Sequence, residues 1–170
     1  MIKPILLSLA LVMITGCSSS PKKVAPPKVK KMAHKMFQSV PKEQATLLQK
    51  GKNREYCHIC GMNLPKFYKT NHAANENGVV HQYCSIHCLA NDLRHGAKLK
   101  NLQVVDTKSL KFISATKAYY VVGSEKHGTM SRVSKYAFKS LDDAKAFQAK
   151  YGGKIVDFNS ALQIAKKDFK

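Results

Sequence analysis

Four cysteines in the middle of this chain are the residues best suited to do chemistry. They form two closely spaced pairs, Cys57-His-Ile-Cys60 and Cys84-Ser-Ile-His-Cys88. Each pair can present two sulfur atoms from a single turn, and two such pairs can converge on one soft metal ion. Met62 follows Cys60 after a single glycine, and a thioether is a poor ligand for zinc but a good one for Cu(I). The pattern predicts a metal site and favours copper.

Three other uses of these cysteines remain open. Structural zinc held by all four thiols is the strongest rival, and it would make the protein a binding or scaffold module. Two disulfides are a further alternative in an exported protein, although structural bridges usually close longer loops than these spacings allow. A thiol-disulfide role of the thioredoxin type needs a helix to begin at Cys57-x-x-Cys60, and the nearby Gly61 and Pro65 argue against that helix.

Histidine is a further candidate ligand. Of the seven histidines, His87 is the best placed, because it directly precedes Cys88 near the expected start of a helix. A solvated or core position is the alternative for each of them. The sequence shows no general acid–base pair, phosphate-binding loop or nucleophile–base arrangement. We therefore expect no catalytic residues, and a metal-binding protein rather than an enzyme.

The N-terminus has the features of a bacterial export signal. One lysine precedes an apolar run that is too short to span a bilayer as a stable helix. The run ends in Ile14-Thr15-Gly16-Cys17, which closely resembles the lipobox of bacterial lipoproteins, in which the cysteine is acylated and becomes the first mature residue. Residues 1–16 are thus predicted to be a signal peptide and Cys17 a lipid anchor. We expect a periplasmic protein attached to a membrane, and Ser18 favours the outer membrane.

The chain is strongly basic, with 29 Lys and Arg against 10 Asp and Glu and a formal net charge of +19. Such an excess is typical of nucleic-acid binding proteins. Export to the periplasm argues against that partner, and the sequence contains no recognised nucleic-acid motif. A basic surface with affinity for anionic lipid or for an acidic partner is the interpretation that we favour.

Residues 17–40 are rich in Ser, Pro and Lys and have little apolar surface to bury. They are predicted to form an extended tether between the anchor and a globular head. Met32-Ala-His34-Lys-Met36 at the end of the tether could hold a second copper ion, although such methionines more often pack. Residues 41–55 are predicted to contain a short helix over Pro41–Lys50 and a lead-in to the metal motif.

Residues 56–107 are predicted to form a first ββαβ unit. Leu64–Thr70 and Val79–Tyr83 have strand composition, and an Asn-Gly step between them is typical of a hairpin turn. Ser85 is placed to cap a helix whose apolar residues recur at helical spacing until Gly96. Leu102–Asp106 is the expected closing strand.

Residues 108–170 repeat this order as a second ββαβ unit. Two strands are expected at Tyr119–Val122 and Tyr136–Phe138. Ser140 and Asp143 then form the pattern of a capping box, and Gly152-Gly153 ends the helix before a strand over Lys154–Phe158. One such unit buries too little apolar surface to be stable alone. We therefore predict an α+β fold in which two similar units share a core or pack closely against each other.

Short motifs spread over roughly residues 55–160 can be compared with known families. They are Cys57-x-x-Cys60-Gly61-Met62, Ala118-Tyr119-Tyr120-Val121-Val122-Gly123-Ser124, Gly128-Thr129-Met130, Ala137-Phe138 and Tyr151-Gly152-Gly153. Together with the lipobox they resemble the NosL family, copper-binding lipoproteins that accompany nitrous oxide reductase. The resemblance implies two ββαβ units and a periplasmic chaperone that delivers Cu(I) to the copper–sulfide centre of the reductase, with the apo-reductase or its assembly machinery as the partner.

The resemblance also bears on individual ligands. The family's Cys-Gly-Met step falls on Cys60, Gly61 and Met62, and its second methionine falls on Met130. The Cys84-x3-Cys88 pair either enlarges this copper site or forms a separate one.

Overall fold

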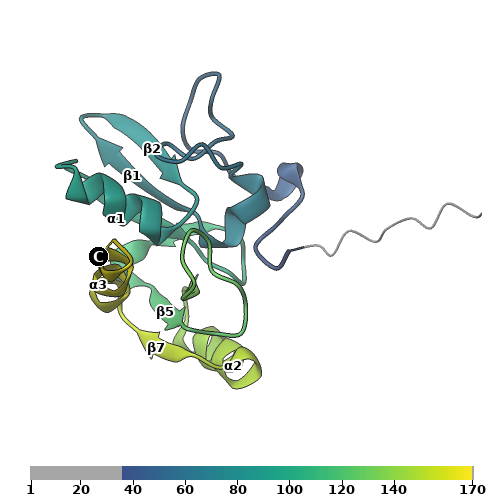
Figure 1. Ribbon diagram of the computed structural model, residues 1–170. Coiled ribbons are helices and arrows are strands. Elements are labelled where there is room, and N and C mark those ends of the chain that lie inside the picture. The colour runs from purple at the N-terminus through teal and green to yellow at the C-terminus, as the bar shows by residue number, and fades with distance from the viewer. Residues whose placement is uncertain (1–35, 170) are drawn as a thin grey trace, which may run out of the picture. The chain divides into compact units, whose positions relative to one another are not determined.

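The computed structural model describes residues 36–169 (Figure 1). The predicted signal peptide, the lipidation site Cys17 and most of the predicted tether lie outside the described residues. Within residues 36–169, no helix is long and apolar enough to cross a membrane. The boundaries chosen above for the anchor and the tether therefore stay predictions.

The first sheet is built around the strand that follows Asn71. Its strands are β1 (His72–Glu76), β2 (Val79–Tyr83), β3 (Lys100–Val105) and β4 (Phe112–Ser114), all antiparallel and in the order β2-β1-β3-β4. Asn77 and Gly78 connect β1 to β2 with φ values of +49° and +87°. Positive φ at both central residues is the geometry of the tight hairpin turn that the Asn-Gly step predicts.

Helix α1 (Ile86–Arg94) follows β2 directly and carries Cys88 in its first turn. Its buried face consists of Ile86, Cys88, Leu89 and Ala90. Ser85 occupies the N-cap position as predicted, but its side chain makes no capping hydrogen bond with a described residue. The helix ends at His95 and Gly96, and Gly96 has a φ of +96°.

The second sheet repeats the arrangement of the first. Its strands are β5 (Tyr119–Val122), β6 (Lys135–Phe138) and β7 (Lys154–Val156), antiparallel in the order β6-β5-β7. Helix α2 (Leu141–Tyr151) begins at the predicted N-cap Ser140, whose Oγ accepts the Asp143 N–H at 3.1 Å. Ser140 Oγ also donates to Asp143 Oδ2 at 2.9 Å, so Asp143 bonds the Ser140 side chain in place of the backbone N–H that a full capping box uses. In both sheets the first strand of the ββαβ order is flanked by the second and the third, so the predicted repeat is confirmed.

Two predicted elements are wrong. Leu64–Thr70 is not a strand: Pro65–Thr70 forms a 3-10 helix, and the first strand comes after it as β1. Pro65 lacks an N–H and presets a helical φ, and Asn63 Oδ1 accepts the Lys66 N–H at 3.1 Å, so the local chemistry favours a helical turn. The helix expected over Pro41–Lys50 is reduced to a 3-10 turn at Lys42–Gln44.

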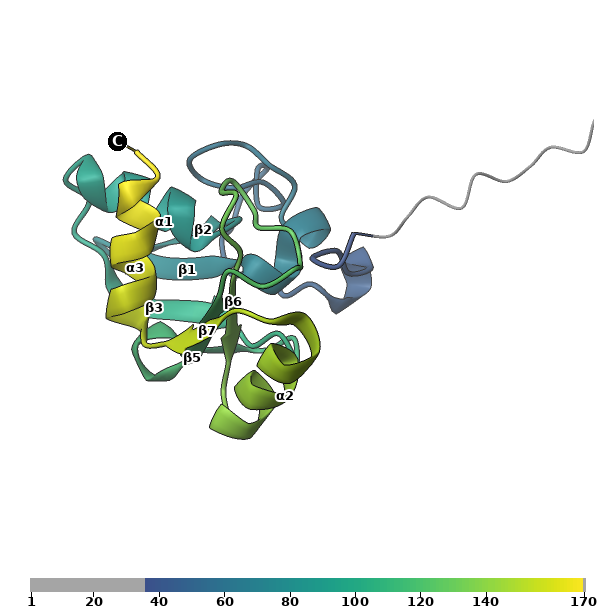
Figure 2. The ribbon, with the colours of Figure 1, turned by 60° about the horizontal axis from the view of Figure 1, so that its bottom comes forward.

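Three further elements were not predicted. A 3-10 turn, Ala115–Lys117, joins β4 to β5, and β4 itself extends the first sheet. Helix α3 (Phe158–Lys167) follows β7, capped by Asp157 Oδ1, which accepts the Ser160 N–H at 2.8 Å. Figure 2 shows α3 lying beside α1, so the last helix covers the helix that carries Cys88.

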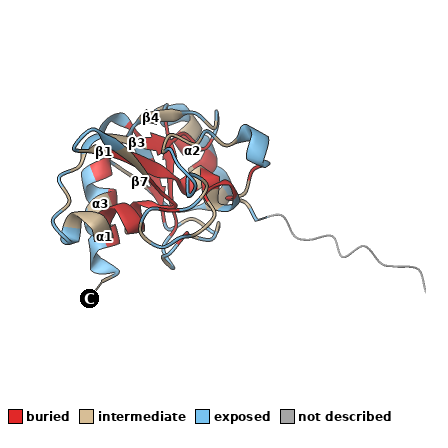
Figure 3. Cartoon of the chain, turned by 90° about the horizontal axis from the view of Figure 1, so that it is seen from above, coloured by how far each residue is buried: buried red, intermediate tan, exposed pale blue. Residues whose placement is uncertain are grey.

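A single apolar cluster runs through both sheets and the helices α1 and α3. It includes Leu89 from α1, Val104 from β3, Tyr120 from β5 and Ala161 from α3. In Figure 3 the buried residues are concentrated where these elements meet. The expectation that the two units pack together around a common core is confirmed, and Cys57, Cys84 and Cys88 of the metal motif belong to that core.

Candidate metal centre

The sulfur atoms of Cys57, Cys60, Cys84 and Cys88 all lie within 4.8 Å of one another. Cys84 Sγ is 3.6 Å from Cys60 Sγ and 3.6 Å from Cys88 Sγ. A tetrahedral ion with metal–sulfur bonds of about 2.3 Å places its sulfur ligands about 3.8 Å apart, so the four thiols fit one metal ion. The Cys84–Cys88 pair therefore lies in one cluster with the first pair, and ligation of a single ion by all four thiols stays a prediction.

A tight loop presents the first two thiols. The loop is closed by a bridge between Tyr56 and Asn63 and by the Cys57 N–H, which donates to Met62 O at 2.8 Å. Inside the loop the Gly61 N–H donates to Cys57 O at 3.0 Å, and Gly61 has a φ of +70° that a larger residue rarely adopts. The Cys-Gly-Met step thus turns the chain so that Cys57 and Cys60 face the same point.

The second pair comes from the junction of β2 and α1. Cys84 follows the last residue of β2, and Cys88 lies in the first turn of α1. The Thr70 hydroxyl lies 2.8 Å from Cys84 O and 2.8 Å from the Thr129 hydroxyl, both within hydrogen-bond distance. A strand end and a helix start therefore hold these two sulfurs, and Thr70, which also contacts Thr129 of the second unit, supports the backbone of Cys84.

Burial differs sharply among the four thiols. Cys57, Cys84 and Cys88 are each at most 3% exposed, whereas Cys60 is exposed. Hydrogen bonds from the thiols of Cys84 and Cys88 lower the pKa of Cys57, while contacts with Cys57 and Cys88, together with burial, raise the pKa of Cys84. The pKa of Cys88 is also raised, by its contact with Cys57. The cluster thus favours one thiolate that accepts hydrogen bonds from neighbouring thiols, and a bound cation would replace their protons.

The two methionines proposed as ligands lie in different settings. Met62 is partly buried in the Cys57–Cys60 loop and packs against the apolar cluster that contains Cys57, Cys84 and Cys88. Met130 is 43% exposed in the loop between β5 and β6 and has a left-handed φ of +59°. Its neighbour Thr129 touches Thr70, which supports Cys84. Copper ligation by either methionine stays a prediction.

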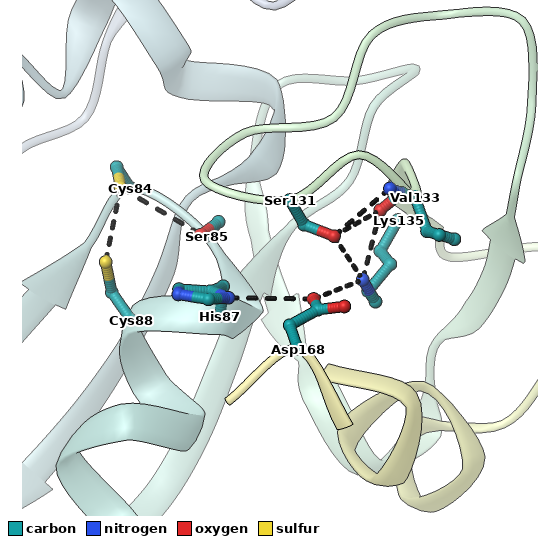
Figure 4. Close-up of polar contacts among 8 residues, drawn as sticks. All are labelled: Cys84, Ser85, His87, Cys88, Ser131, Val133, Lys135 and Asp168. Atoms are coloured by element: carbon teal, nitrogen blue, oxygen red, sulfur yellow. Dashed lines mark hydrogen bonds and ion pairs between the residues drawn. The ribbon is translucent and has the colours of Figure 1, made fainter. Parts of the chain in front are cut away.

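His87 contacts residues near the C-terminus. Its Nδ1 lies 3.6 Å from Asp168 Oδ2, too far for a hydrogen bond, and its ring packs on Phe169 at 4.4 Å between centroids. Asp168 Oδ2 also pairs with the buried Lys135 Nζ at 3.3 Å, and Lys135 donates to Ser131 Oγ at 3.0 Å (Figure 4). The expectation that His87 binds metal stays a prediction. Its observed contacts place the start of α1 beside the residues that follow α3, and one of these, Asp168, pairs in turn with Lys135 of β6.

Sequence reasoning missed this supporting network. Burial lowers the pKa of Lys135, and Asp168 opposes that shift as an ion-pair partner. Nothing in the sequence marks Lys135 or Asp168 among so many charged residues. A helical stripe over α3, from Phe158 through Ala161 to Ala165, is the signal that could have revealed the last helix.

A cavity of about 840 Å³ borders the centre on the side of Cys57. Two histidines that the sequence analysis did not single out, His58 and His81, lie in its wall. Their rings stack with centroids 3.8 Å apart and planes inclined by 30°. The four-thiol cluster is therefore open to solvent at Cys60 and adjoins a cavity next to Cys57.

Comparisons with known proteins agree with this arrangement. The NosL family model matches residues 49–163. The copper-binding lipoprotein NosL of Stutzerimonas stutzeri is 31% identical over 122 residues, covering 63% of this chain and 62% of the relative. This chain thus spans less than two thirds of that relative's length. The names of the relatives describe a binding protein and a chaperone, not enzymes.

A solved structure shares the fold. The crystal structure of the copper chaperone NosL from Shewanella denitrificans superposes with a TM-score of 0.53 at 26% sequence identity, covering 71% of this chain and 96% of the other. The α+β fold predicted from the sequence is therefore that of a known copper chaperone structure. Because the family model spans most of the described residues, including all four clustered cysteines, the chain belongs to the NosL family.

Proposed function

We propose that this protein is a lipid-anchored periplasmic copper chaperone that carries Cu(I) on its four-thiol centre and delivers it to nitrous oxide reductase for assembly of the copper–sulfide centre. The observation that carries the proposal is the convergence of four thiols at one point in a chain of the NosL family. Thiolates and thioethers are the ligands that select Cu(I). The relative from Stutzerimonas stutzeri, named a copper-binding lipoprotein, supports both the cargo and the anchor.

The unequal exposure of the ligands supports transfer rather than storage. Three buried sulfurs can hold the ion in a dry environment, while Cys60 faces solvent. A partner's ligand can replace Cys60 first, and the ion can then move by stepwise exchange without being released into water. Met62 directly follows Gly61 in the same loop and can act as a weak, neutral donor during this exchange.

Structural zinc is the second candidate function. The 3.6 Å sulfur spacings suit a closed tetrahedral zinc site, and such sites usually stabilise a fold without releasing their ion. In that case Met62 and Met130 are packing residues, and Cys60→Ser would destabilise the metal-loaded fold instead of blocking transfer.

Delivery is tested with the purified full chain loaded with Cu(I) and mixed anaerobically with copper-free nitrous oxide reductase. The proposal expects copper to move to the reductase, and expects Cys60→Ser to prevent it. His95→Gln is the matched control, because His95 is exposed at the end of α1 and lies outside the four-thiol cluster. Full copper loading of the reductase by the Cys60→Ser variant would remove this protein from the delivery route.

The anchor is tested separately with Cys17→Ser in cells. This variant is expected to accumulate as unprocessed or soluble protein while its head still binds copper, because the tether separates the lipid from the fold. Fractionation of the wild-type protein between inner and outer membranes checks the preference for the outer membrane. Loss of copper binding in Cys17→Ser would mean that this cysteine is a ligand.

A further inference from the structure

The first residues of the described head lie among lysines that are stacked on aromatic rings. Lys69 Nζ is 4.2 Å from the centroid of the Phe37 ring, and Lys126 Nζ is 5.4 Å from the same centroid. Lys126 Nζ is also 4.2 Å from the centroid of the Tyr151 ring, and Lys150 Nζ is 5.2 Å from it. The two ring centroids are 5.9 Å apart. Three ammonium groups from distant parts of the chain are therefore held around two neighbouring rings. We call these five residues the entry face.

An apolar hollow adjoins the entry face. It has a volume of about 330 Å³, and Phe37 and Lys69 belong to both. Its other lining residues include Met36, which is 36% exposed, and the partly buried Leu110. Lysines beside accessible apolar side chains are typical of protein surfaces that lie on anionic bilayers, because the ammonium groups meet the lipid phosphates while the apolar groups enter the interface.

The charges around the entry face favour an anionic partner. Two exposed carboxylates lie near it in sequence: Glu125 precedes Lys126, and Glu43 precedes Gln44 of the hollow. The three lysines of the face outnumber them. Residues 17–35, which lead to the face, add six lysines and no acidic residue. The chain on both sides of Met36 therefore carries an excess of positive charge.

The place where the chain joins the head selects a membrane among the anionic partners. Even a fully extended chain over residues 17–35 spans at most about 65 Å, so a lipid on Cys17 keeps the head close to the bilayer at a high local concentration. The head is joined to this segment at Met36, directly beside Phe37. In Figures 1 and 2 the first described residues lie on the side of the head away from α1 and α3.

We propose that the entry face and its hollow bind the anionic bilayer to which the chain is anchored, with the lysines at the lipid phosphates and Met36 and Phe37 in the interface. This inference rests on the lipid anchor of the proposed function. None of the four clustered cysteines belongs to the entry face or lines the hollow, so the thiols stay accessible to a partner while the head is docked.

The test uses the lipidated full chain in nanodiscs that contain a lipid with a spin-labelled headgroup. One set of discs combines phosphatidylethanolamine with the anionic phosphatidylglycerol, and the reference set contains phosphatidylcholine alone. In the anionic discs the amide NMR signals of residues 36–40 and of α2 are expected to broaden, whereas those of α1 and α3 keep their intensity. Added salt is expected to reverse the broadening, because it screens the lysines from the lipid.

The triple variant Lys69→Gln, Lys126→Gln and Lys150→Gln is expected to lose this broadening, since each lysine near an anionic surface contributes about fivefold to the ratio of docked to free heads. The matched control removes the same charge from three exposed lysines near α1 and α3, Lys98→Gln, Lys117→Gln and Lys166→Gln, and is expected to keep it. Lys150→Gln alone, at an exposed position, serves if the triple variant does not fold.

Equal broadening in neutral and anionic discs, broadening centred on α1 and α3, or an equal loss in the control variant would overturn the inference. Chelator-resistant Cu(I) is measured in the same samples, and its absence from the wild-type protein would contradict the copper function while leaving the docking result intact. A chain that carries no lipid would contradict the anchor; sedimentation of that chain with vesicles of the same two compositions then tests the face, and equal binding to both would refute it.

Discussion

At the scale of single residues, exposure separates the four thiols into two kinds. Cys57, Cys84 and Cys88 are part of the shared apolar core, whereas Cys60 lies at the surface of its loop. Replacing a buried thiol therefore changes both the metal site and the packing around it. Replacing Cys60 changes the metal site and leaves the core in place, which makes it the cleaner probe of ligand chemistry.

The first prediction compares Cys60→Ser with Cys88→Ser. Cys60→Ser is expected to remove most Cu(I) affinity while changing the unfolding free energy of the metal-free protein by no more than about 0.5 kcal/mol, as for other surface changes. Cys88→Ser places a more polar group in the core and is expected to cost about 1–3 kcal/mol in the metal-free protein. Urea unfolding of both variants and chelator competition measure the two effects; wild-type Cu(I) affinity in Cys60→Ser would contradict the assignment.

At the scale of elements, one buried polar pair joins the two sheets. His72 on β1 and Tyr120 on β5 are both almost fully buried, and His72 Nε2 lies 3.1 Å from the Tyr120 hydroxyl. His72 Nδ1 lies 3.0 Å from Thr70 O. Thr70 is also the residue whose hydroxyl donates to Cys84 O. Burial lowers the pKa of His72 to about 4. The neutral ring is therefore part of the folded state.

This pair predicts a pH dependence of stability. In the unfolded chain His72 titrates near 6.5, so below that pH the unfolded state takes up a proton that the folded state binds only near pH 4. The contribution of His72 to stability is complete above pH 6.5 and falls by about 3 kcal/mol as the pH drops to 4. Urea unfolding at pH 7.5 and 4.5 measures the loss.

The variant His72→Gln isolates this contribution, because it removes the titrating group and leaves the other acids and bases unchanged. Its unfolding free energy is expected to fall less steeply with decreasing pH than that of the wild-type protein. Equal pH dependence in the two proteins would mean that His72 is accessible to protons in the folded state.

The sequence predictions were most accurate for features set by residues close together in the chain, and least accurate for features set by contacts between distant residues. Local chemistry was sufficient for the Asn77-Gly78 turn and for the N-cap that Ser140 forms with Asp143. It failed at Leu64–Thr70, where strand composition competes with Pro65 and the side chain of Asn63. Convergence of the four cysteines was expected from their spacing, but the histidine pair depends on a contact between a loop and β2 that no local pattern encodes.

At the scale of the whole described head, the residues near the C-terminus complete the support of the four-thiol cluster. Helix α3 packs beside α1, and Asp168 pairs with Lys135, whose side chain is only 3% exposed. Phe169 packs on His87 and under the guanidinium of Arg94. The residues that follow the second ββαβ repeat therefore hold the helix that carries Cys88.

Breaking the buried ion pair tests this support. Asp168→Asn leaves Lys135 buried without its counterion and is expected to lower the unfolding free energy by about 1–3 kcal/mol. The control is Lys42→Met, which removes the exposed pair with Glu55 and should cost at most about 0.5 kcal/mol. Thermal or urea unfolding compares the two variants, and equal stability would mean that Lys135 reaches solvent when Asp168 is neutralised.

The identity of the cargo is the central claim, and competition between metals measures it directly. The reduced full chain is given equal amounts of Cu(I) and Zn(II) in the presence of a Cu(I) chelator, and the bound metals are then quantified. We predict that copper occupies the four-thiol centre and displaces zinc, because the soft sulfur donors favour the softer ion. Zinc retained at one equivalent under a saturating Cu(I) challenge would contradict the chaperone assignment and make the centre a structural zinc site.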